Sequence, residues 1–401
     1  MWHRICIFIV MSFVFNLNLR GGQTMSSNWW QDLTVKERMD WLTEQAKKLI
    51  EGCRTKANDG TVLYCPDGKG HYAALWTRDF AYMVENCPDM IPSEHVEACI
   101  RYLLSGQRND GCIPDRRQPD GLSVYSAGAV EHPAGEPPLD NSQFMVFLVC
   151  DHIEHTKNFN LFNEFAPKLD KAMDYIPRSV EGLVFNDPKK PHSPYGFTDT
   201  VGKTGQLFFE SLLYWRACKR MAELHNRVGD KKRAEEYEKR ASLIERNIDL
   251  LWDDSVGMFL AASIDCRQID IWGNAYALYI GFPLGEKRER ILKFLVHNYD
   301  RYVWLGQIRH LLKGEYWQRL LVPVEQERYQ NGAYWATASG WVIWALPEVE
   351  PKLAQKTFCD LVDDFKANGI CECVNEGYRQ LESYVVSATN PLGAMRRLIG
   401  Q

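Results

Sequence analysis

Residues 206–252 read QLFFESLLYWRACKRMAELHNRVG-D-KKRAEEYEKRASLIERNIDLLW. In the second half of this stretch, apolar residues recur every three or four positions, and Glu, Lys and Arg occupy the positions between them. The apolar set is Ala234, Tyr237, Ala241, Ile244 and Ile248. Gly229 ends the first half, as glycine commonly does just after a helix. The pattern therefore predicts two helices joined by a tight turn, a helical hairpin over 205–252.

The same helical period recurs along most of the chain. Further helices are predicted over 34–52, 93–106, 141–156, 160–176, 268–280, 286–299, 332–346 and 351–367. Thr34 and Glu37 have the form of a capping box, and Ser93 is expected to cap the helix that it begins. The longest loops, 107–140 and 177–204, are rich in Gly, Pro, Asn and Asp.

No alternation of period two is long enough for a large sheet, and no Pro/Ser-rich linker divides the chain. About ten to twelve helices, joined alternately by short turns and long loops, are typical of stacked helical hairpins. Closing six such hairpins into a ring gives an all-α (α/α)6 toroid. We therefore expect a single domain over 25–401, with its inner helices buried and its long loops gathered on one face.

The composition favours a sugar and argues against nucleic acid. The 401 residues are 45% hydrophobic and 12% aromatic, with 13 Trp and 18 Tyr. Trp and Tyr are large and rigid, so an excess of them suits either a large core or a cleft that stacks flat apolar faces, such as those of sugar rings. The net charge is −5 and no Lys/Arg-rich stripe is present, which excludes nucleic acid as the expected partner.

The N-terminal segment 1–24 has features of a leader. Residues 5–15 form an apolar run that fits a signal-peptide core and is too short to span a membrane. No small-x-small cleavage site follows, and Met25 opens an ordinary soluble sequence, so 1–24 is either a leader or an upstream extension. A signal peptide would place the protein in the secretory or endomembrane system; otherwise a cytoplasmic location is expected. No other membrane association is predicted. The cysteines lack CxxC spacing, which indicates buried free thiols.

The segment His71–Asp79, HYAALWTRD, is the first with a specific chemical pattern. An Arg–Asp pair can bind sugar hydroxyls from two directions while an indole covers the face of the ring. Trp76, Arg78 and Asp79 are therefore candidate binding residues. The alternative is a buried ion pair at the start of a helix.

Three motifs in this order resemble the six-hairpin glycosidases: LWTRD (75–79), PPLDNSQ (137–143) and YQNGAYW (329–335). The resemblance runs from about residue 40 to the C-terminus. It is closest to the processing α-glucosidase and glucosylglycerate hydrolase group, with similarity to the glucoamylase, trehalase and rhamnosidase clans. It implies an (α/α)6 barrel, hydrolysis of glycosidic bonds with inversion, and substrate-binding roles for Asp140, Asn141 and Gln143.

Inverting hydrolysis requires two carboxyl groups on opposite sides of the sugar, one as acid and one as base. In the related enzymes the acid lies in the loop before the hairpin over 205–252. Asp199 is the only carboxylate in that loop, which reads YGFTDTVGKTG from Tyr195 to Gly205. Its apolar neighbours would raise its pKa and help it to hold a proton. Lys203 would oppose this unless it contacts substrate. The alternative is that Asp199 caps the following helix.

The base of the related enzymes comes from a C-terminal loop, with a Glu shortly after a Gly. The segment GICECVNEG over 369–377 offers Glu372 and Glu376. Glu372 matches the family position better, while Glu376 suits an exposed turn. No His lies near Cys371 and Cys373, and the spacing of these two cysteines is not that of a zinc site. We expect no metal or cofactor.

Two more segments are predicted to line the cleft. DIWGNAY over 270–276 offers Trp272 and Asn274, and YQNGAYW offers Gln330, Asn331 and Trp335. Amides pair with hydroxyls while aromatic rings stack on the sugar. The alternative is an ordinary Asn-Gly turn followed by a core tryptophan.

The chain departs from the family in being short. The β-rich domain that precedes the barrel in many relatives has no room here, and this suggests a small substrate, a disaccharide or glycoside. The expected function is an exo-acting inverting glycosidase. Two alternatives remain: a sugar epimerase or lyase on the same toroid, which would need paired histidines, and a non-catalytic carbohydrate-binding protein, which would not need two opposed carboxylates.

Overall fold

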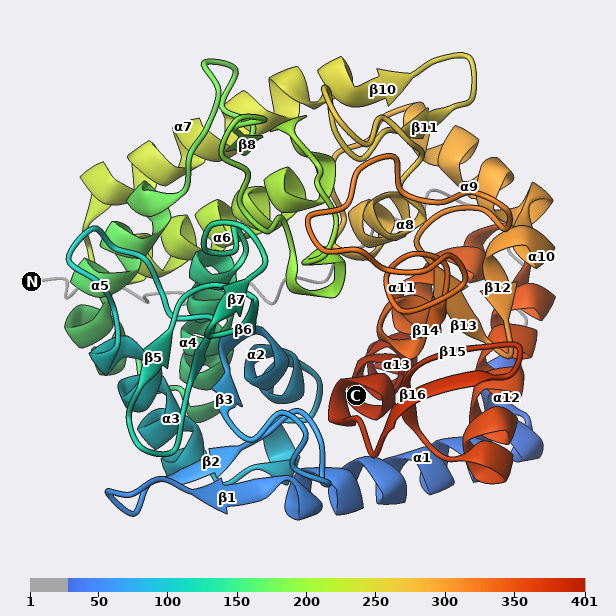
Figure 1. Ribbon diagram of the computed structural model, residues 1–401, viewed down its shortest axis with the longest axis horizontal. Coiled ribbons are helices and arrows are strands. Elements are labelled where there is room, and N and C mark those ends of the chain that lie inside the picture. Colours follow the sequence, from blue (N-terminus) through green and yellow to red (C-terminus); the bar gives the residue numbers. More distant parts are fainter. Residues whose placement is uncertain (1–27, 401) are drawn as a thin grey trace, which may run out of the picture.

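The computed structural model describes residues 28–400, whose helices form two concentric layers around one axis (Figure 1). Each inner helix contacts the next one along the chain, and the last contacts the first, so that the inner ring is closed. The inner helices are α2 (Thr77–Asn86), α4 (Asn141–Thr156), α6 (Phe208–Arg227), α8 (Ile271–Tyr279), α11 (Ser339–Ala345) and α13 (Val385–Leu398). This closure confirms the predicted (α/α)6 toroid.

The outer helices alternate with the inner ones along the chain, and they surround the inner ring. Among their contacts, α1 lies against α13, α5 against α4, α7 against α6, and α12 against α11. The outer helices are α1 (Leu33–Gly52), α3 (Ser93–Ser105), α5 (Asn160–Tyr175), α7 (Lys231–Asn247), α9 (Lys287–His297) and α12 (Pro351–Asn368), and a short helix α10 (Tyr299–Tyr302) follows α9.

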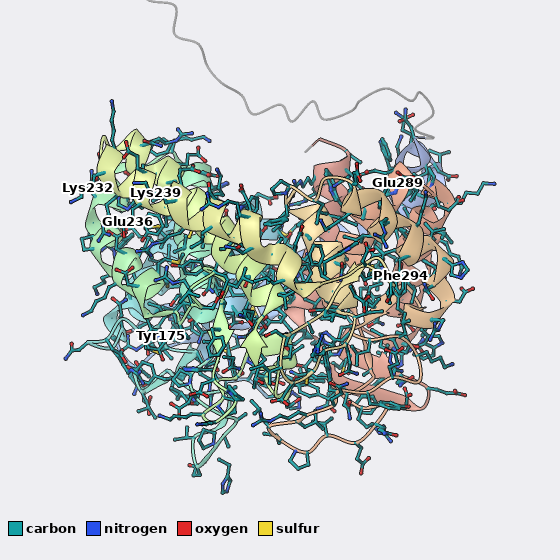
Figure 2. All side chains as sticks on the ribbon, turned by 90° about the horizontal axis from the view of Figure 1, so that it is seen from above. Tyr175, Lys232, Glu236, Lys239, Glu289 and Phe294 are labelled. Atoms are coloured by element: carbon teal, nitrogen blue, oxygen red, sulfur yellow. The ribbon has the colours of Figure 1, made fainter. Side chains whose placement is uncertain are left out.

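Burial separates the two layers. All nine residues of α8 are buried, whereas α7 buries only Ala234, Tyr237, Ala241 and Ile244. An amphipathic helix that rests on a core buries one stripe, and a helix enclosed on all sides is apolar all round. Lys232, Glu236 and Lys239 accordingly lie on the outer side of α7 (Figure 2).

The α6–α7 hairpin forms where the sequence predicts it. Gly229 lies between the helices with φ +86, a left-handed conformation that glycine adopts without strain. Asp230 then caps α7, because its side chain accepts a hydrogen bond from the backbone N–H of Arg233 at 3.1 Å. Trp215 of α6 donates its indole N–H to Glu245 of α7 at 2.7 Å, which ties the two helices together.

Short antiparallel strands connect the helices on the loop face. A five-stranded sheet follows chain order: β12 (Val303–Trp304), β13 (Gln307–Arg309), β14 (Tyr334–Trp335), β15 (Cys371–Asn375) and β16 (Tyr378–Glu382). A three-stranded sheet contains β3 (Leu75–Trp76), β4 (Arg116–Arg117) and β5 (Ser123–Val124). The two-stranded pairs are β1 (Arg54–Lys56) with β2 (Val62–Tyr64), β6 (Gly128–Ala129) with β7 (His132–Pro133), β8 (Phe185–Asn186) with β9 (Gly205–Gln206), and β10 (Trp252–Asp253) with β11 (Met258–Phe259). These strands of two to five residues are too short to produce a visible period of two.

Two inner helices, α2 and α13, are absent from the predicted set. Helix α2 has ten residues, fewer than the roughly 11–18 over which a helical period is usually recognised, and nine of them are buried. Helix α13 is mostly buried as well and contains Pro391. The helix predicted over 332–346 is also shorter than expected, because its first part forms β14 and the 3-10 turn η5 (Ala336–Ala338).

Both predicted helix caps are wrong by one or two residues. Asp32 caps α1, accepting a hydrogen bond from the backbone N–H of Thr34 at 2.8 Å, so Thr34 lies inside the helix. Pro92 precedes α3, and Ser93 occupies its first position without a side-chain capping bond. In each case the residue at the cap, Asp32 in α1 and Pro92 in α3, lies one or two positions before the expected cap.

Three further observations concern the chain as a whole. The predicted leader over 1–24 lies outside the described residues. Within residues 28–400, no helix combines the length and the apolar character that a membrane crossing requires. The described cysteines are all free, and every one except Cys359 is buried.

Candidate active site

The candidate residues gather at the N-terminal ends of the inner helices. Arg78 and Asp79 lie in the first turn of α2, Asp140 precedes α4, Asp270 caps α8, and Tyr384 precedes α13. The N-terminal end of a helix carries a partial positive charge, which favours carboxylates placed there. The ring therefore directs several helix dipoles at one end of its axis, where acidic side chains are concentrated.

Asp199 ends a 3-10 turn, η3 (Gly196–Thr198), and is half-buried. Gln330 donates its amide N–H to Oδ1 of Asp199 at 2.8 Å. Burial raises the pKa of Asp199 to about 7, reinforced by Asp115 and Asp140 and opposed by Arg78 and the Gln330 hydrogen bond. The next helix, α6, begins only at Phe208, so Asp199 does not cap it. A carboxyl group with this pKa can hold a proton close to neutral pH.

Glu372 lies inside β15 and is only 2% exposed. The hydroxyl of Tyr72 donates to its Oε1 at 3.1 Å, while its Oε2 accepts no hydrogen bond from any group in residues 28–400. Burial raises the pKa of Glu372 well above its ordinary value, and Asp79 and Asp199 add to this effect, whereas the Tyr72 hydrogen bond opposes it. Glu376, the other candidate base, is exposed at the turn between β15 and β16.

Tyr72 and Tyr329 lie close to both carboxyl groups. The pKa values of Tyr72 and Tyr329 are raised well above normal, chiefly by burial, and Glu372 and Asp199 each contribute to both. Charges act on a phenol in this way only at short range, so both rings lie near both carboxyl groups. Tyr329 has φ +40, an unusual backbone conformation for a bulky residue. Tyr72 donates to Glu372, and Tyr329 precedes Gln330, which donates to Asp199, so the two tyrosines connect the surroundings of the two carboxyl groups.

Arg78 forms the centre of a buried ionic cluster. Its Nη1 lies 3.2 Å from Asp140 Oδ2 and 3.5 Å from Asp115 Oδ1, and its Nη2 lies 3.8 Å from Asp79 Oδ2. Burial raises the pKa values of Asp79 and Asp140, and Asp115 adds to this effect, whereas Arg78 opposes it. Asp115 lies in the predicted loop over 107–140 and was not singled out from the sequence, and the structure brings it into the cluster.

The cluster also fixes the loop that carries Asp199. The backbone N–H of Gly196 donates to Asp140 Oδ2 at 3.0 Å. A Cβ at Gly196 would lie 1.5 Å from Cζ of Arg78, so only glycine allows the loop to lie against the guanidinium. Arg78 and Asp140 therefore hold the loop that carries Asp199 in place through its residue Gly196.

Asp79, which is buried, and Trp76, which is half-buried, lie next to these groups. Tyr384 donates its hydroxyl to Oδ1 of Asp79 at 2.5 Å. Trp76 is half-buried, with Tyr72 edge-on at 5.3 Å and the guanidinium of Arg116 4.6 Å from its ring centroid. This is the arrangement of a carboxylate and an indole that sugar binding uses.

Four other predicted residues have contacts within the protein. Lys203 binds Glu210 at 2.8 Å, with both side chains buried. Asn274 donates to the backbone oxygens of Phe259 and Asp270, and joins α8 to β11. The side chain of Asn331 accepts a hydrogen bond from the backbone N–H of Trp317 at 3.0 Å, and the indole N–H of Trp335 donates to the backbone oxygen of Tyr329 at 3.2 Å.

Trp272, Asn141 and Gln143 are all buried beneath the site. Trp272 stacks on His310 with ring centroids 3.8 Å apart, a contact that the sequence did not indicate. The amide of Asn141 and the Oε1 of Gln143 make no hydrogen bond within residues 28–400. Buried polar groups usually have partners, so these two positions are the predicted residues best suited to bind a polar ligand or ordered water.

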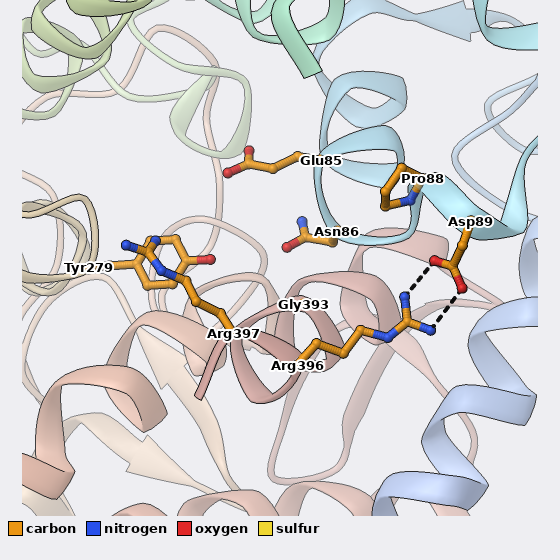
Figure 3. A pocket seen from close by; sticks show the side chains of 8 residues that line it. All are labelled: Glu85, Asn86, Pro88, Asp89, Tyr279, Gly393, Arg396 and Arg397. Carbon is orange, nitrogen blue, oxygen red and sulfur yellow. Dashed lines mark hydrogen bonds and ion pairs between the residues drawn. The ribbon is translucent and has the colours of Figure 1, made fainter. Parts of the chain in front are cut away.

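A separate cavity of about 460 Å³ lies at the opposite ends of the inner helices, where α2 and α13 finish (Figure 3). Arg396 pairs there with Asp89 at 2.7 Å, and Arg397 lies over the ring of Tyr279 at 4.7 Å. None of the residues predicted for the site lines this cavity. Asp199 and Glu372 lie in the segments that connect the helices, away from this cavity, so the loop face is the candidate active site.

The sequence of residues 168–380, more than half of the chain, matches the model of the mannosylglycerate hydrolase MGH1-like glycoside hydrolase domain. The chain belongs to this family of glycoside hydrolases. The predicted six-hairpin glycosidase resemblance is confirmed at this level. No protein with a curated function matches the sequence.

Solved structures of glycosidases share the fold of this family member. A rhamnosidase from Klebsiella oxytoca with rhamnose bound has a TM-score of 0.64 and 13% identity, over 91% of this chain and 64% of that one. The GH63 mannosylglycerate hydrolase from Thermus thermophilus in complex with glucose has a TM-score of 0.63 and 15% identity, over 88% of this chain and 99% of that one. The GH78 rhamnosidase of Bacillus sp. GL1 has a TM-score of 0.61 and 13% identity, over 90% of this chain and 35% of that one. The chain thus spans less than two thirds of either rhamnosidase, but nearly the whole length of the Thermus hydrolase.

Proposed function

We propose that the protein is an exo-acting inverting glycoside hydrolase in which Asp199 is the general acid and Glu372 the general base. The observation that carries this proposal is a pair of carboxyl groups whose surroundings are joined through Tyr72 and Tyr329. Each has a raised pKa, and they differ in their hydrogen bonds: Asp199 accepts from an amide, while Glu372 has one oxygen without a partner among residues 28–400.

The reaction needs one proton given and one taken. Asp199 donates its proton to the glycosidic oxygen as the bond from that oxygen to the anomeric carbon breaks. Its pKa of about 7 keeps it protonated in slightly acidic to neutral solution. The leaving group departs as an alcohol, and Asp199 remains as a carboxylate that Arg78 and Gln330 stabilise.

Glu372 acts on the opposite side of the sugar. Its Oε2 is the acceptor for a proton of water, whose oxygen attacks the anomeric carbon from the face away from the leaving group. The base must be ionised first, and burial opposes ionisation. The Tyr72 hydrogen bond favours the ionised form, so Tyr72 sustains the base in its working state.

The substrate that we propose is a small oligosaccharide or glycoside, α-glucosidase-like in its linkage. Trp76 supplies a ring to stack on the sugar, and Asp79 an acceptor for its hydroxyls. The family is named for a mannosylglycerate hydrolase, and two of the similar structures are rhamnosidases. The panel of substrates must therefore contain α-glucosides, α-mannosides including mannosylglycerate, and α-rhamnosides.

The test is to assay this panel with the wild type, Asp199→Asn and Glu372→Gln, following the product anomer by NMR. General acid–base catalysis contributes about 10²- to 10⁴-fold, so each variant is expected to lose about that much of kcat. Glu376→Gln is the matched control, because the same substitution four residues along the chain affects an exposed carboxylate. It should retain wild-type activity.

Four outcomes would overturn parts of the proposal. Full activity in Asp199→Asn or Glu372→Gln would remove that residue from its role. Retention of the anomeric configuration would exclude the inverting mechanism. Binding of sugars without turnover would identify a carbohydrate-binding protein, and isomerised or unsaturated products would identify an epimerase or lyase.

A further inference from the structure

We propose that Gln330 is the positioning residue of the acid: its amide determines which oxygen of Asp199 carries the proton that is transferred. This inference rests on the proposed role of Asp199. It also changes the role expected for Gln330 from the sequence, which was to bind the sugar directly.

The amide of Gln330 is fully occupied by the loop that carries Asp199. The side chain is completely buried. Its Nε2 donates to Asp199 Oδ1 at 2.8 Å and to the backbone oxygen of Gly196 at 3.2 Å. Its Oε1 accepts from the backbone N–H and the hydroxyl of Thr200, at 2.9 and 2.8 Å. An amide has two donor hydrogens and an acceptor oxygen with two lone pairs, so no capacity remains for a substrate.

The orientation of this amide follows from its neighbours. The backbone N–H of Thr200 can only donate, so the group that faces it must be the oxygen of Gln330. The backbone oxygen of Gly196 can only accept, so the group that faces it must be the nitrogen. Two backbone groups of one short loop therefore direct the N–H of Gln330 towards Asp199.

A donor at Oδ1 has a definite chemical effect on Asp199. A protonated carboxyl group has one hydroxyl oxygen and one carbonyl oxygen, and the carbonyl oxygen is the better acceptor. The N–H of Gln330 therefore favours the form in which Oδ1 is the carbonyl and Oδ2 carries the proton. After proton transfer, the same bond stabilises the carboxylate. The bond lowers the pKa of Asp199 against the effect of burial, so its loss should raise that pKa.

The turn that presents Gln330 is held under backbone strain. Tyr329 and Glu327 have φ +40 and +63, both in the left-handed region. The Trp335 indole holds the backbone oxygen of Tyr329, and Arg309 binds Glu327 at 2.7 Å. Strained backbone persists where surrounding contacts over-determine it, and it is concentrated at functional sites. The strain here serves to place one amide against one carboxyl oxygen.

The experiment compares the wild type with Gln330→Met, which has a side chain of similar length without hydrogen-bond groups. Two substrates of the same sugar are needed, an alkyl glycoside, whose leaving group must be protonated, and a glycosyl fluoride, whose leaving group needs no acid. We expect a loss of about 10- to 100-fold in kcat on the alkyl glycoside. The loss on the fluoride should be less than roughly threefold, since acid catalysis makes no contribution to that step.

Gln268→Met is the matched control. Gln268 also holds a loop through both ends of its amide, donating to the backbone oxygen of Tyr316 at 2.7 Å and accepting from the N–H of Gln318 at 3.0 Å. Both of its bonds are to other loops, and neither reaches Asp199. Equal losses on both substrates in Gln330→Met, or the same selectivity in Gln268→Met, would overturn the proposal.

A direct titration separates this inference from the proposed function. The carboxyl carbons of ¹³C-labelled aspartate are followed by NMR against pH, with Asp199→Asn identifying the Asp199 signal. Its midpoint should move to higher pH in Gln330→Met and stay in place in Gln268→Met. An unmoved midpoint refutes the role of Gln330, whatever the substrate panel shows. If Gln330→Met does not fold, Gln330→Leu, which also lacks the N–H and adds no charge beside Asp199, gives the same reading.

Discussion

Removing the hydroxyl of Tyr72 tests whether the base depends on a single hydrogen bond. In Tyr72→Phe the ring is kept, and with it the edge contact to Trp76 at 5.3 Å, but Oε1 of Glu372 loses its donor. A hydrogen bond to an ionised group contributes about 1.5–3 kcal/mol. The 3.1 Å length points to the lower part of that range. About 1.4 kcal/mol corresponds to a factor of ten. At a pH below the pKa of Glu372, the fraction of this residue that is ionised should therefore fall about 10-fold.

The sign follows from which form is active. The Tyr72 bond lowers the pKa of Glu372, so the variant has a higher pKa and fewer molecules with an ionised base. The acidic limb of the profile of kcat/KM against pH, which reports the ionisation of Glu372, should move to higher pH. At about pH 6, kcat/KM should fall about 10-fold. The assay is sugar release measured between about pH 4 and 10, which brackets the ordinary carboxyl and phenol ranges, together with a ¹³C titration of the glutamate carboxyls.

Tyr64→Phe is the control for this measurement. The hydroxyl of Tyr64 lies 2.8 Å from Nδ1 of His95 and its ring is buried, so the variant also loses a tyrosine hydrogen bond from the interior. Tyr64→Phe should change the stability of the protein without moving either limb of the profile of kcat/KM against pH. A Tyr72→Phe profile that overlays that of the wild type would refute the assignment of Tyr72 as the partner of the base.

Two further predictions concern the frame of the site. Gly196→Ala places a methyl group 1.5 Å from Cζ of Arg78, so the free energy of unfolding should fall by at least about 3 kcal/mol in a denaturant titration; Gly52→Ala, with open space around its Cβ, should fall by less than about 1 kcal/mol. Lys203→Met leaves Glu210 as a buried carboxylate without its cation and should cost about 3–5 kcal/mol at about pH 7. Because burial already raises the pKa of Glu210, the folded variant binds a proton that the unfolded chain has lost, and its stability should recover as the pH is lowered. A raised KM without lost stability in Lys203→Met would instead show that Lys203 binds substrate.

The outer layer of the fold could be predicted because its helices are amphipathic. Helix α7 begins at Lys231 as expected, since one stripe of its residues is buried and the rest is polar. Of the inner helices, α2 and α13 were not predicted: α2 has only ten residues, and α13 contains Pro391, a residue that ordinarily argues against a helix interior. The toroid was still predicted correctly, because the number and order of the predicted helices are those of six hairpins that close into a ring.

For the site, the sequence indicated which loops matter better than what each side chain does. Asp199 and Glu372 were chosen from their loops, and Gln330 from its motif, but the bond between Gln330 and Asp199 joins residues 131 positions apart. Tyr72 lies within the first motif, and its partner Glu372 lies 300 positions away. Such pairings depend on how the ring closes, and no local pattern records them. The nearest available signals were the tyrosines at positions 72 and 329, each within or beside a quoted motif.

The closure of the ring between α13 and α2 has a consequence for biosynthesis. The contacts from Tyr72 to Glu372 and from Asp79 to Tyr384 span 300 and 305 residues, so both form only after the C-terminal part of the chain has left the ribosome. Until then, the apolar inner helices have no closing partner and present adhesive surfaces to other nascent chains. Contacts of such long sequence separation also form slowly. Residue 384 must therefore have left the ribosome before these contacts exist, and a chain interrupted before that point cannot form them.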